Sequence, residues 1–253
     1  MIYDLQKANF WKRISAWLLD FIVFIVLAAG IFWFISWAVG YDAKIEAMQE
    51  YYVKYSEEYG IDLDISAEEY NKLSDEEKAK YIEADEALGK DPEVLRAYNL
   101  VYNLTLVVIF ASLLVSYVIL EFVVPLFLKN GQTVGKKVFG IGVIRTNCVR
   151  ASNTILFIRM LLGKFTIETM VPVFLIIMIL FGILGYVGVG VIIAMLILEL
   201  IVVIVTKTRS PIHDLLADTV VVDMSTQLVF ETEADLIEYK KRLHAEEVAR
   251  AEY

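Results

Sequence analysis

The stretch that decides the fold is Thr169–Thr206, with the sequence TMVPVFLIIMILFGILGYVGVGVIIAMLILELIVVIVT. These 38 consecutive residues hold a single charged side chain, that of Glu199. A membrane-spanning helix needs about 20 predominantly apolar residues, so the stretch is long enough for two helices. Two more stretches have the same character, each with one acid: Ile14–Val39 with Asp20, and Leu100–Leu128 with Glu121. The sequence therefore predicts an integral membrane protein that crosses the bilayer several times.

The composition agrees with this class and excludes others. Hydrophobic residues make up 58% of the 253 residues, and the mean hydropathy is +0.60. The net charge of −9 belongs to one segment, Asp42–Ala97, which holds 17 acidic and seven basic residues. Nothing in this pattern indicates binding to nucleic acid. The single cysteine, Cys148, and two histidines 31 residues apart predict no disulfide, no metal site and no cofactor.

The basic residues predict the orientation of the chain in the membrane. Cytoplasmic loops carry an excess of lysine and arginine. Three regions show that excess: the N-terminus with Lys7, Lys12 and Arg13, the segment Lys129–Glu168 with seven bases against one acid, and Lys207 with Arg209. We therefore expect a multi-pass protein of the cell membrane with both termini in the cytoplasm and the acidic segment outside.

The same reasoning requires the last apolar stretch to return to the side from which it starts. Glycines gather at its midpoint, where a tight hairpin needs them: Gly182, Gly185, Gly188 and Gly190. Each limb would have only about 17 residues, the lower limit for crossing a bilayer. Two crossings are therefore expected, and a re-entrant pair that does not reach the far face stays open as the alternative.

The expected fold class is an all-α polytopic membrane bundle of four transmembrane helices, with a helical external insertion and a small cytoplasmic two-strand element. The chain divides into a first helix with a cytoplasmic N-terminus (1–41), the acidic external insertion (42–97), a second helix (98–128), a basic cytoplasmic segment (129–168), a helical hairpin (169–206) and a cytoplasmic motif with a helical tail (207–253). The insertion is predicted to be helical because Ser66–Glu69 and Ser74–Glu77 have the capping-box pattern and Asp91-Pro92 is typical of a helix start.

The basic segment contains a glycine-rich motif formed by Gly131, Thr133, Gly135 and Lys136. It is not a phosphate-binding loop, because three residues instead of four separate the glycines and Lys137 stands where Ser or Thr is required. Two β-branched runs, 141–146 and 219–223, are expected to pair as strands. Ser210-Pro211 predicts a short helix that carries His213 and Asp214.

These motifs together resemble the RDD family of membrane proteins. The segment Arg13-Ile-Ser-Ala-Trp-Leu-Leu-Asp20 is similar to the signature of the family's first helix. The family is named for an arginine and two aspartates. The resemblance maps the arginine to Arg13 and the aspartates to Asp20 and Asp214. Further matching pieces are 117–121, the glycine-rich motif, 140–144, the arginine segment around Arg159 and the run 213–222. The chain departs from the family in having Asp218 where glycine is common, and in its acidic insertion.

The resemblance implies transport of an ion or small solute, and cation/proton exchange is proposed for some members. The buried acids favour the same reading, since an ionisable group inside a membrane marks a functional site by default. Asp20, Glu121 and Glu199 each lie seven or eight residues from the nearest base at the end of their stretch, about 10–12 Å deep at 1.5 Å per residue. The transport and ion-pair candidates are Arg13, Asp20, Glu121, Arg159, Glu199 and Asp214.

The transport hypothesis predicts two specific pairings of side chains. Asp214 is expected to pair with Arg13 at the cytoplasmic face, and Glu121 is expected to be the nearest acidic partner of Asp20. A carrier with four helices would work most simply as a homodimer that moves a monovalent cation or a proton. The alternative is a membrane scaffold or accessory factor in which the acids only form structural ion pairs and a membrane partner protein docks. No enzyme is expected, because no catalytic motif is visible.

Overall fold

The computed structural model of the protein describes residues 5–251. The regular structure of these residues consists of helices and two short strands, and the chain divides into two compact units. Unit 1 contains the chain up to Leu27 and from Leu114 onward, whereas unit 2 contains Ala28–Leu113.

Four helical segments are long and apolar enough to cross a membrane, which confirms the expected bundle class. Their surfaces are rich in exposed large apolar side chains, such as Trp33 and Leu196. In a bilayer these side chains would contact lipid tails. The four spans consist of α1 (Phe10–Ala38); α5 (Pro92–Tyr117), η1 (Val118–Val123) and α6 (Val124–Leu128); α8 (Asn153–Ile158), η2 (Arg159–Met170) and α9 (Val171–Leu180); and α10 (Gly185–Val205).

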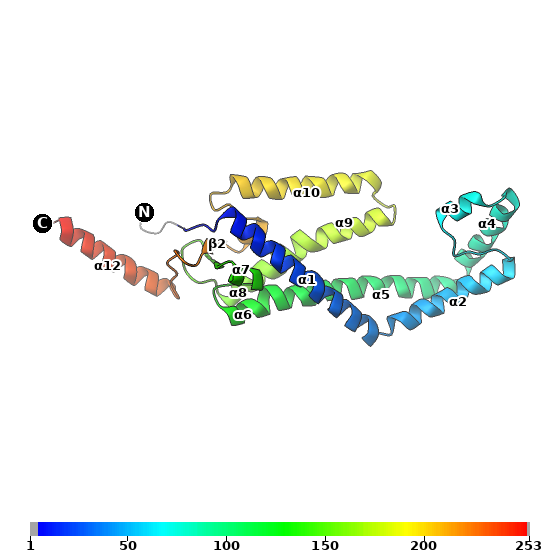
Figure 1. Ribbon diagram of the computed structural model, residues 1–253, viewed down its shortest axis with the longest axis horizontal. Coiled ribbons are helices and arrows are strands. Elements are labelled where there is room, and N and C mark those ends of the chain that lie inside the picture. The colour runs from blue at the N-terminus through cyan, green and yellow to red at the C-terminus, as the bar shows by residue number, and fades with distance from the viewer. Residues whose placement is uncertain (1–4, 252–253) are drawn as a thin grey trace. The chain divides into compact units, whose positions relative to one another are not determined.

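The last two spans form the expected hairpin, in which α9 and α10 pack side by side (Figure 1). Gly182 and Gly185 have positive φ angles of 70° and 48° at the turn. The two limbs are 28 and 21 residues long, which favours two crossings over a re-entrant pair. The structure differs from the expected boundary at residue 169, because the third span begins at Asn153. Its charged residues face the interior of unit 1, as described below, and so do not mark the end of the helix.

Two of the spans contain π-helical segments, η1 and η2, and each is followed by a proline. Pro125 is the second residue of α6, and Pro172 is the second residue of α9. Proline has no N–H and its ring clashes with the carbonyl four residues earlier, so the normal i→i+4 ladder cannot continue there. The i→i+5 bonds of a π-helix replace it, as when the Val171 N–H donates to the Thr166 carbonyl.

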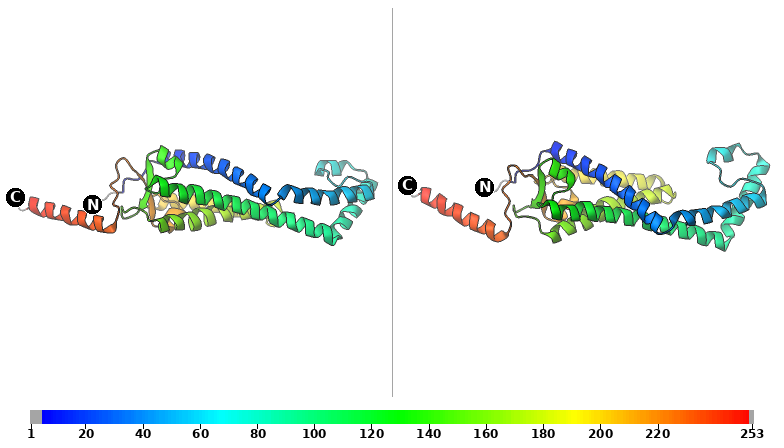
Figure 2. Two further views of the ribbon diagram at one scale, coloured as in Figure 1. Left: turned by 90° about the horizontal axis from the view of Figure 1, so that it is seen from below. Right: turned by 60° about the horizontal axis from the view of Figure 1, so that its bottom comes forward.

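Short elements gather at one end of unit 1, beside α6 and α8 (Figure 2). They are α7 (Val134–Val138), β1 (Ile141–Arg145), α11 (Ile212–Leu216) and β2 (Thr219–Asp223). The two strands pair antiparallel, with Ile141 opposite Asp223 and Arg145 opposite Thr219, which confirms the expected two-strand element. A small core beside the sheet buries Ala16, Ile141, Val143, Leu156 and Val221. The sheet therefore joins two segments of the chain: the one before the third span, through β1, and the one after the fourth span, through β2.

The tail ends in α12 (Glu233–Ala251). Phe230, just before this helix, and Leu236, in its first turns, pack on Cys148 and Val149.

Unit 2 contains α2 (Tyr41–Tyr59), α3 (Ala67–Lys72) and α4 (Asp75–Lys90). Both expected capping boxes are present, at Ser66 with Glu69 and at Ser74 with Glu77. Asp91 accepts a hydrogen bond from the Glu93 N–H at the start of α5. A core of its own holds the unit together: Leu63, Ala84, Leu88 and Val94, covered by tyrosines.

Candidate functional site

The first part of the site joins Asp20 on α1 to the glycine-rich motif. Asp20 Oδ1 accepts a hydrogen bond of 2.7 Å from the Gly135 N–H, and Oδ2 accepts one of 2.5 Å from the Thr133 hydroxyl. A Cβ on Gly135 would lie 2.2 Å from the Ala16 carbonyl oxygen, so only glycine lets α7 approach α1 this closely. The motif therefore binds a carboxylate of the protein itself. Gly131 has a φ of +58° and packs against Val143, so it shapes the turn before α7.

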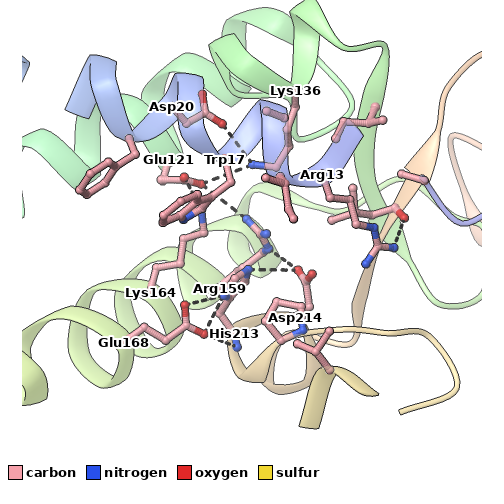
Figure 3. A pocket seen from close by; sticks show the side chains of 18 of the residues that line it. Arg13, Trp17, Asp20, Glu121, Lys136, Arg159, Lys164, Glu168, His213 and Asp214 are labelled. Atoms are coloured by element: carbon pink, nitrogen blue, oxygen red, sulfur yellow. Dashed lines mark hydrogen bonds and ion pairs between the residues drawn. The ribbon is translucent and has the colours of Figure 1, made fainter. Parts of the chain in front are cut away.

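The second part of the site surrounds Glu121, which is 8% exposed on η1. Its Oε1 forms an ion pair with Lys164, while Oε2 lies 3.6 Å from Arg159 Nη1 and 3.9 Å from Lys136 Nζ. Lys136 Nζ is also 4.0 Å from Asp20 Oδ2 and donates to Thr133. Lys136 thus connects Asp20 to Glu121, as Figure 3 shows.

The third part of the site is the buried pair of Arg159 and Asp214, whose exposed fractions are 3% and 0%. Arg159 Nε lies 2.6 Å from Asp214 Oδ1, which also accepts a hydrogen bond of 2.9 Å from the Thr219 hydroxyl. This corrects the expected pairing of Asp214 with Arg13. Arg13 instead donates to two backbone carbonyls, those of Arg209 at 2.7 Å and Val221 at 2.6 Å. Its guanidinium is held by the loop and the sheet, and the charge of Asp214 acts on it without forming an ion pair.

The fourth part of the site pairs Glu168 with His213. His213 Nδ1 lies 2.7 Å from each carboxylate oxygen of Glu168, and the His213 N–H also donates to it at 3.1 Å. A Cβ on Gly163 would lie 2.4 Å from His213 Cβ, so this glycine lets α11 rest directly on η2. His213 Nε2 is 3.7 Å from Asp214 Oδ1 and links this pair to the rest.

The helix geometry explains why sequence reasoning missed Lys164 and Glu168. Arg159 and Glu168 are nine residues apart, which is two and a half turns of an α-helix, so an α-helix would place them on opposite faces. A π-helix has roughly 4.4 residues per turn, and nine residues then make two turns. Arg159, Lys164 and Glu168 therefore share one face of η2. The only sequence signal was the dense charge before a proline.

Glu199 does not join this group. It is half-buried on α10 and accepts a hydrogen bond of 3.3 Å from the Ile212 N–H. Of the three acids in the apolar stretches, Glu199 is the one that the structure places apart from Asp20 and Glu121, because its carboxylate is turned toward the start of α11. Asp20 and Glu121 do meet, through Lys136 between them.

A cavity of about 330 Å³ lies beside the ionic group. Side chains from α1, η1, α7, η2 and α11 point toward it, including Arg13, Trp17 and the acids and bases described above (Figure 3). Its volume falls in the range of about 300–1,000 Å³ that is typical of ligand pockets. Among residues 5–251, no three His, Cys, Asp or Glu side chains are grouped as metal ligands.

The electrostatics favour proton exchange at two of these groups. Burial lowers the pKa of Lys136 to about 8, although the Glu121 carboxylate opposes this. Burial, together with the positive charge of Arg159, lowers the pKa of His213 below 6.5. Burial raises the pKa of Asp214, but the Arg159 guanidinium outweighs this and holds the pKa below its usual range. Asp214 is thus a fixed charge, whereas Lys136 titrates close to neutral pH and His213 loses its proton at a lower pH than a free imidazole does.

The fold and the site define a helical membrane protein with a buried ionic network next to a cavity. A model of the RDD family matches residues 7–218. Because this match covers most of the chain, the protein belongs to the RDD family, a family of membrane proteins, and the resemblance seen in the motifs is confirmed. Searches among curated proteins and among solved structures found no match.

Proposed function

We propose that the protein transports a small cation or solute across the cell membrane, with the buried ionic network as the binding site and with proton exchange as the coupled step. The observation that carries this proposal is the cavity lined by Asp20, Glu121, Lys136, Arg159 and their partners. Ionisable groups inside a membrane protein mark substrate pathways and proton relays. A substrate that enters the cavity would compete with Lys136 for the two carboxylates beside it.

The proton step is assigned to Lys136 and His213. Both contact carboxylates from other helices, so loss of a proton from either would free a carboxylate for a cation. Lys136 has a pKa of about 8, which places its titration close to working pH. A proton-coupled carrier needs groups of this kind.

The test is flux in vesicles that contain the purified protein. Proton movement is followed with a pH-sensitive dye while gradients of Na⁺, K⁺ or Li⁺ are imposed. Asp20→Asn is expected to abolish flux per folded molecule, and its control is Asp223→Asn, a carboxylate paired with Lys12 outside the cavity. Absence of flux in the wild type under every gradient, or full flux in Asp20→Asn, would defeat the proposal.

We also propose that both termini are cytoplasmic and that unit 2 contains the external insertion. The basic segments beside α1, α6 and α10 support this orientation. Cys148 is buried, so it is replaced by serine and single cysteines are introduced at the exposed positions Glu68 and Glu238. An impermeant maleimide should label Glu68→Cys in intact cells and Glu238→Cys only after permeabilisation. The reverse pattern would overturn the orientation.

The second candidate is a membrane scaffold that docks a partner protein. It is favoured by one observation: each acid of the network already has a basic or hydrogen-bonding partner, as in a structural ion-pair cluster. The two candidates differ in what Asp20→Asn does. A scaffold predicts a lower melting temperature with no flux in either protein, whereas a carrier predicts loss of a measurable flux. In the carrier case we propose a homodimer, because four helices are few for alternating access.

A further inference from the structure

The cavity in unit 1 has two chemically different walls. One wall is the ionic network, and the other is aromatic. Trp17 and Phe21 on α1 stack with ring centroids 5.4 Å apart, and Phe24 packs on Tyr117 at 4.6 Å. Trp17 is 60% exposed and Phe21 is 44% exposed. Since α1 is a membrane-spanning helix, these exposed rings face lipid tails, and the cavity is reached from the bilayer.

Two arginines that line the cavity form no ion pair with a carboxylate of the described part of the chain. They are Arg13 and Arg209. The contacts of Arg13 within 3 Å are the backbone carbonyls of Arg209 and Val221, and its buried Nε has no hydrogen-bond partner. Backbone carbonyls orient a guanidinium without neutralising it, and Asp214 acts on Arg13 through its charge without an ion pair. The remaining three bases, by contrast, each lie within 4.0 Å of a carboxylate.

The lining therefore carries an excess of positive charge at one end. Its bases are Arg13, Lys136, Arg159, Lys164 and Arg209, and its acids are Asp20, Glu121, Glu168 and Asp214. With His213 neutral, five positive charges face four negative ones. A ligand with one negative charge makes the lining neutral. A bare cation would increase the imbalance at the Arg13 end.

We propose that this end of the cavity binds an anionic phospholipid whose phosphodiester carries the only charge of its headgroup, as in phosphatidylglycerol. The phosphate lies between Arg13 and Arg209, and an acyl chain runs along Trp17 and Phe21 into the bilayer. The lining has a basic part and an aromatic part, which favours a lipid over a free phosphate, because a free phosphate has no apolar group to pack against the aromatic wall. Basic pockets between membrane helices bind lipid headgroups in this way. The inference goes beyond the proposed transport function, because the phosphate is placed on Arg13 and Arg209, which form none of the network's ion pairs.

The test measures quenching of Trp17 fluorescence by lipids that carry bromine on their acyl chains. The full-length protein is used, with Phe at the three other tryptophans, Trp11, Trp33 and Trp37. Brominated phosphatidylglycerol should quench at a mole fraction about fivefold lower than brominated phosphatidylcholine does. Arg209→Gln should remove this preference, since the loss of one direct contact with the phosphate is worth about fivefold in affinity.

The matched control is Lys207→Gln, which removes the same charge two residues away at a side chain that does not line the cavity. It should leave the preference unchanged. Equal quenching by the two lipids, or equal effects of Arg209→Gln and Lys207→Gln, would overturn the proposal in favour of general surface attraction. Displacement of the brominated lipid by millimolar glycerol phosphate would overturn it in favour of a soluble phosphate ligand. If the Trp17 variant does not fold, phosphatidylglycerol retained by wild type and by Arg209→Gln after purification is compared by mass spectrometry, with the same expected loss.

Discussion

Removal of the buried Arg159–Asp214 pair should be the most damaging single change in unit 1. Arg159→Gln leaves Asp214, which is 0% exposed, without an ion pair to a permanently charged base among residues 5–251; the Thr219 hydroxyl and His213 remain within 3.7 Å. It also removes one of three bases from Glu121. Loss of one partner of a buried pair costs about 3–5 kcal/mol, because the remaining charge stays buried without compensation. For a chain of this size, each kcal/mol shifts the melting temperature by about 2–4 °C, so a fall of about 6–20 °C is expected.

A double-mutant cycle separates this pair from the general effect of each substitution. Melting temperatures are measured in detergent for Arg159→Gln, Asp214→Asn and the double variant. Because the two side chains are in direct contact, the double variant should be more stable than the sum of the single effects by about 1–3 kcal/mol.

The control cycle uses Arg13→Gln with Asp214→Asn. Arg13 donates to backbone carbonyls and forms no ion pair with Asp214, although the charge of Asp214 still acts on it, so the coupling in this cycle should be clearly weaker than in the Arg159 cycle. Strong coupling to Arg13 together with additivity for Arg159 would refute the assignment of the pair.

Three further predictions concern glycine packing, pH and the core of unit 2. Gly163→Ala should lower the melting temperature strongly, because the new Cβ would lie 2.4 Å from His213 Cβ. The control Gly190→Ala should have little effect, because open space surrounds this glycine. Equal shifts of the melting temperature would contradict the close contact of α11 with η2. The pKa of His213 is lower in the folded state than in the unfolded chain, so stability that is present above pH 6.5 is lost as the pH falls through the lowered pKa. The melting temperature should therefore fall between about pH 7 and about pH 5, and His213→Gln should make this fall smaller. Leu88→Ala should destabilise unit 2 by about 2–5 kcal/mol, as judged by protease resistance, while Ile82→Ala at a half-exposed site should cost far less; similar losses would mean that the core does not hold the unit.

The sequence by itself determined the class of the protein and most of its elements. A long apolar run is visible along one continuous segment, so the first, second and fourth spans and the apolar end of the third could be predicted without tertiary information. Capping at Ser66 and Ser74 is also local, since each hydroxyl bonds an N–H three residues away. The strands 141–145 and 219–223 were visible as β-branched runs. The family motifs identified Arg13, Asp20 and Asp214 as residues of interest.

The partners of those residues were decided only by the tertiary structure. Asp214 pairs with Arg159 and not with Arg13, because Arg13 is held by carbonyls of the loop and the sheet. Glu199 looked equivalent to Asp20 in depth, yet it turns toward Ile212.

The third span shows most clearly why the sequence alone could not identify these partners. Its charges appeared to end the membrane segment at residue 169, but π-helical geometry gathers Arg159, Lys164 and Glu168 on one face and directs them to partners on other helices. Hydropathy measures composition along the chain. The direction of a side chain depends on the residues per turn and on what packs opposite, and these are fixed only when segments far apart in sequence come together.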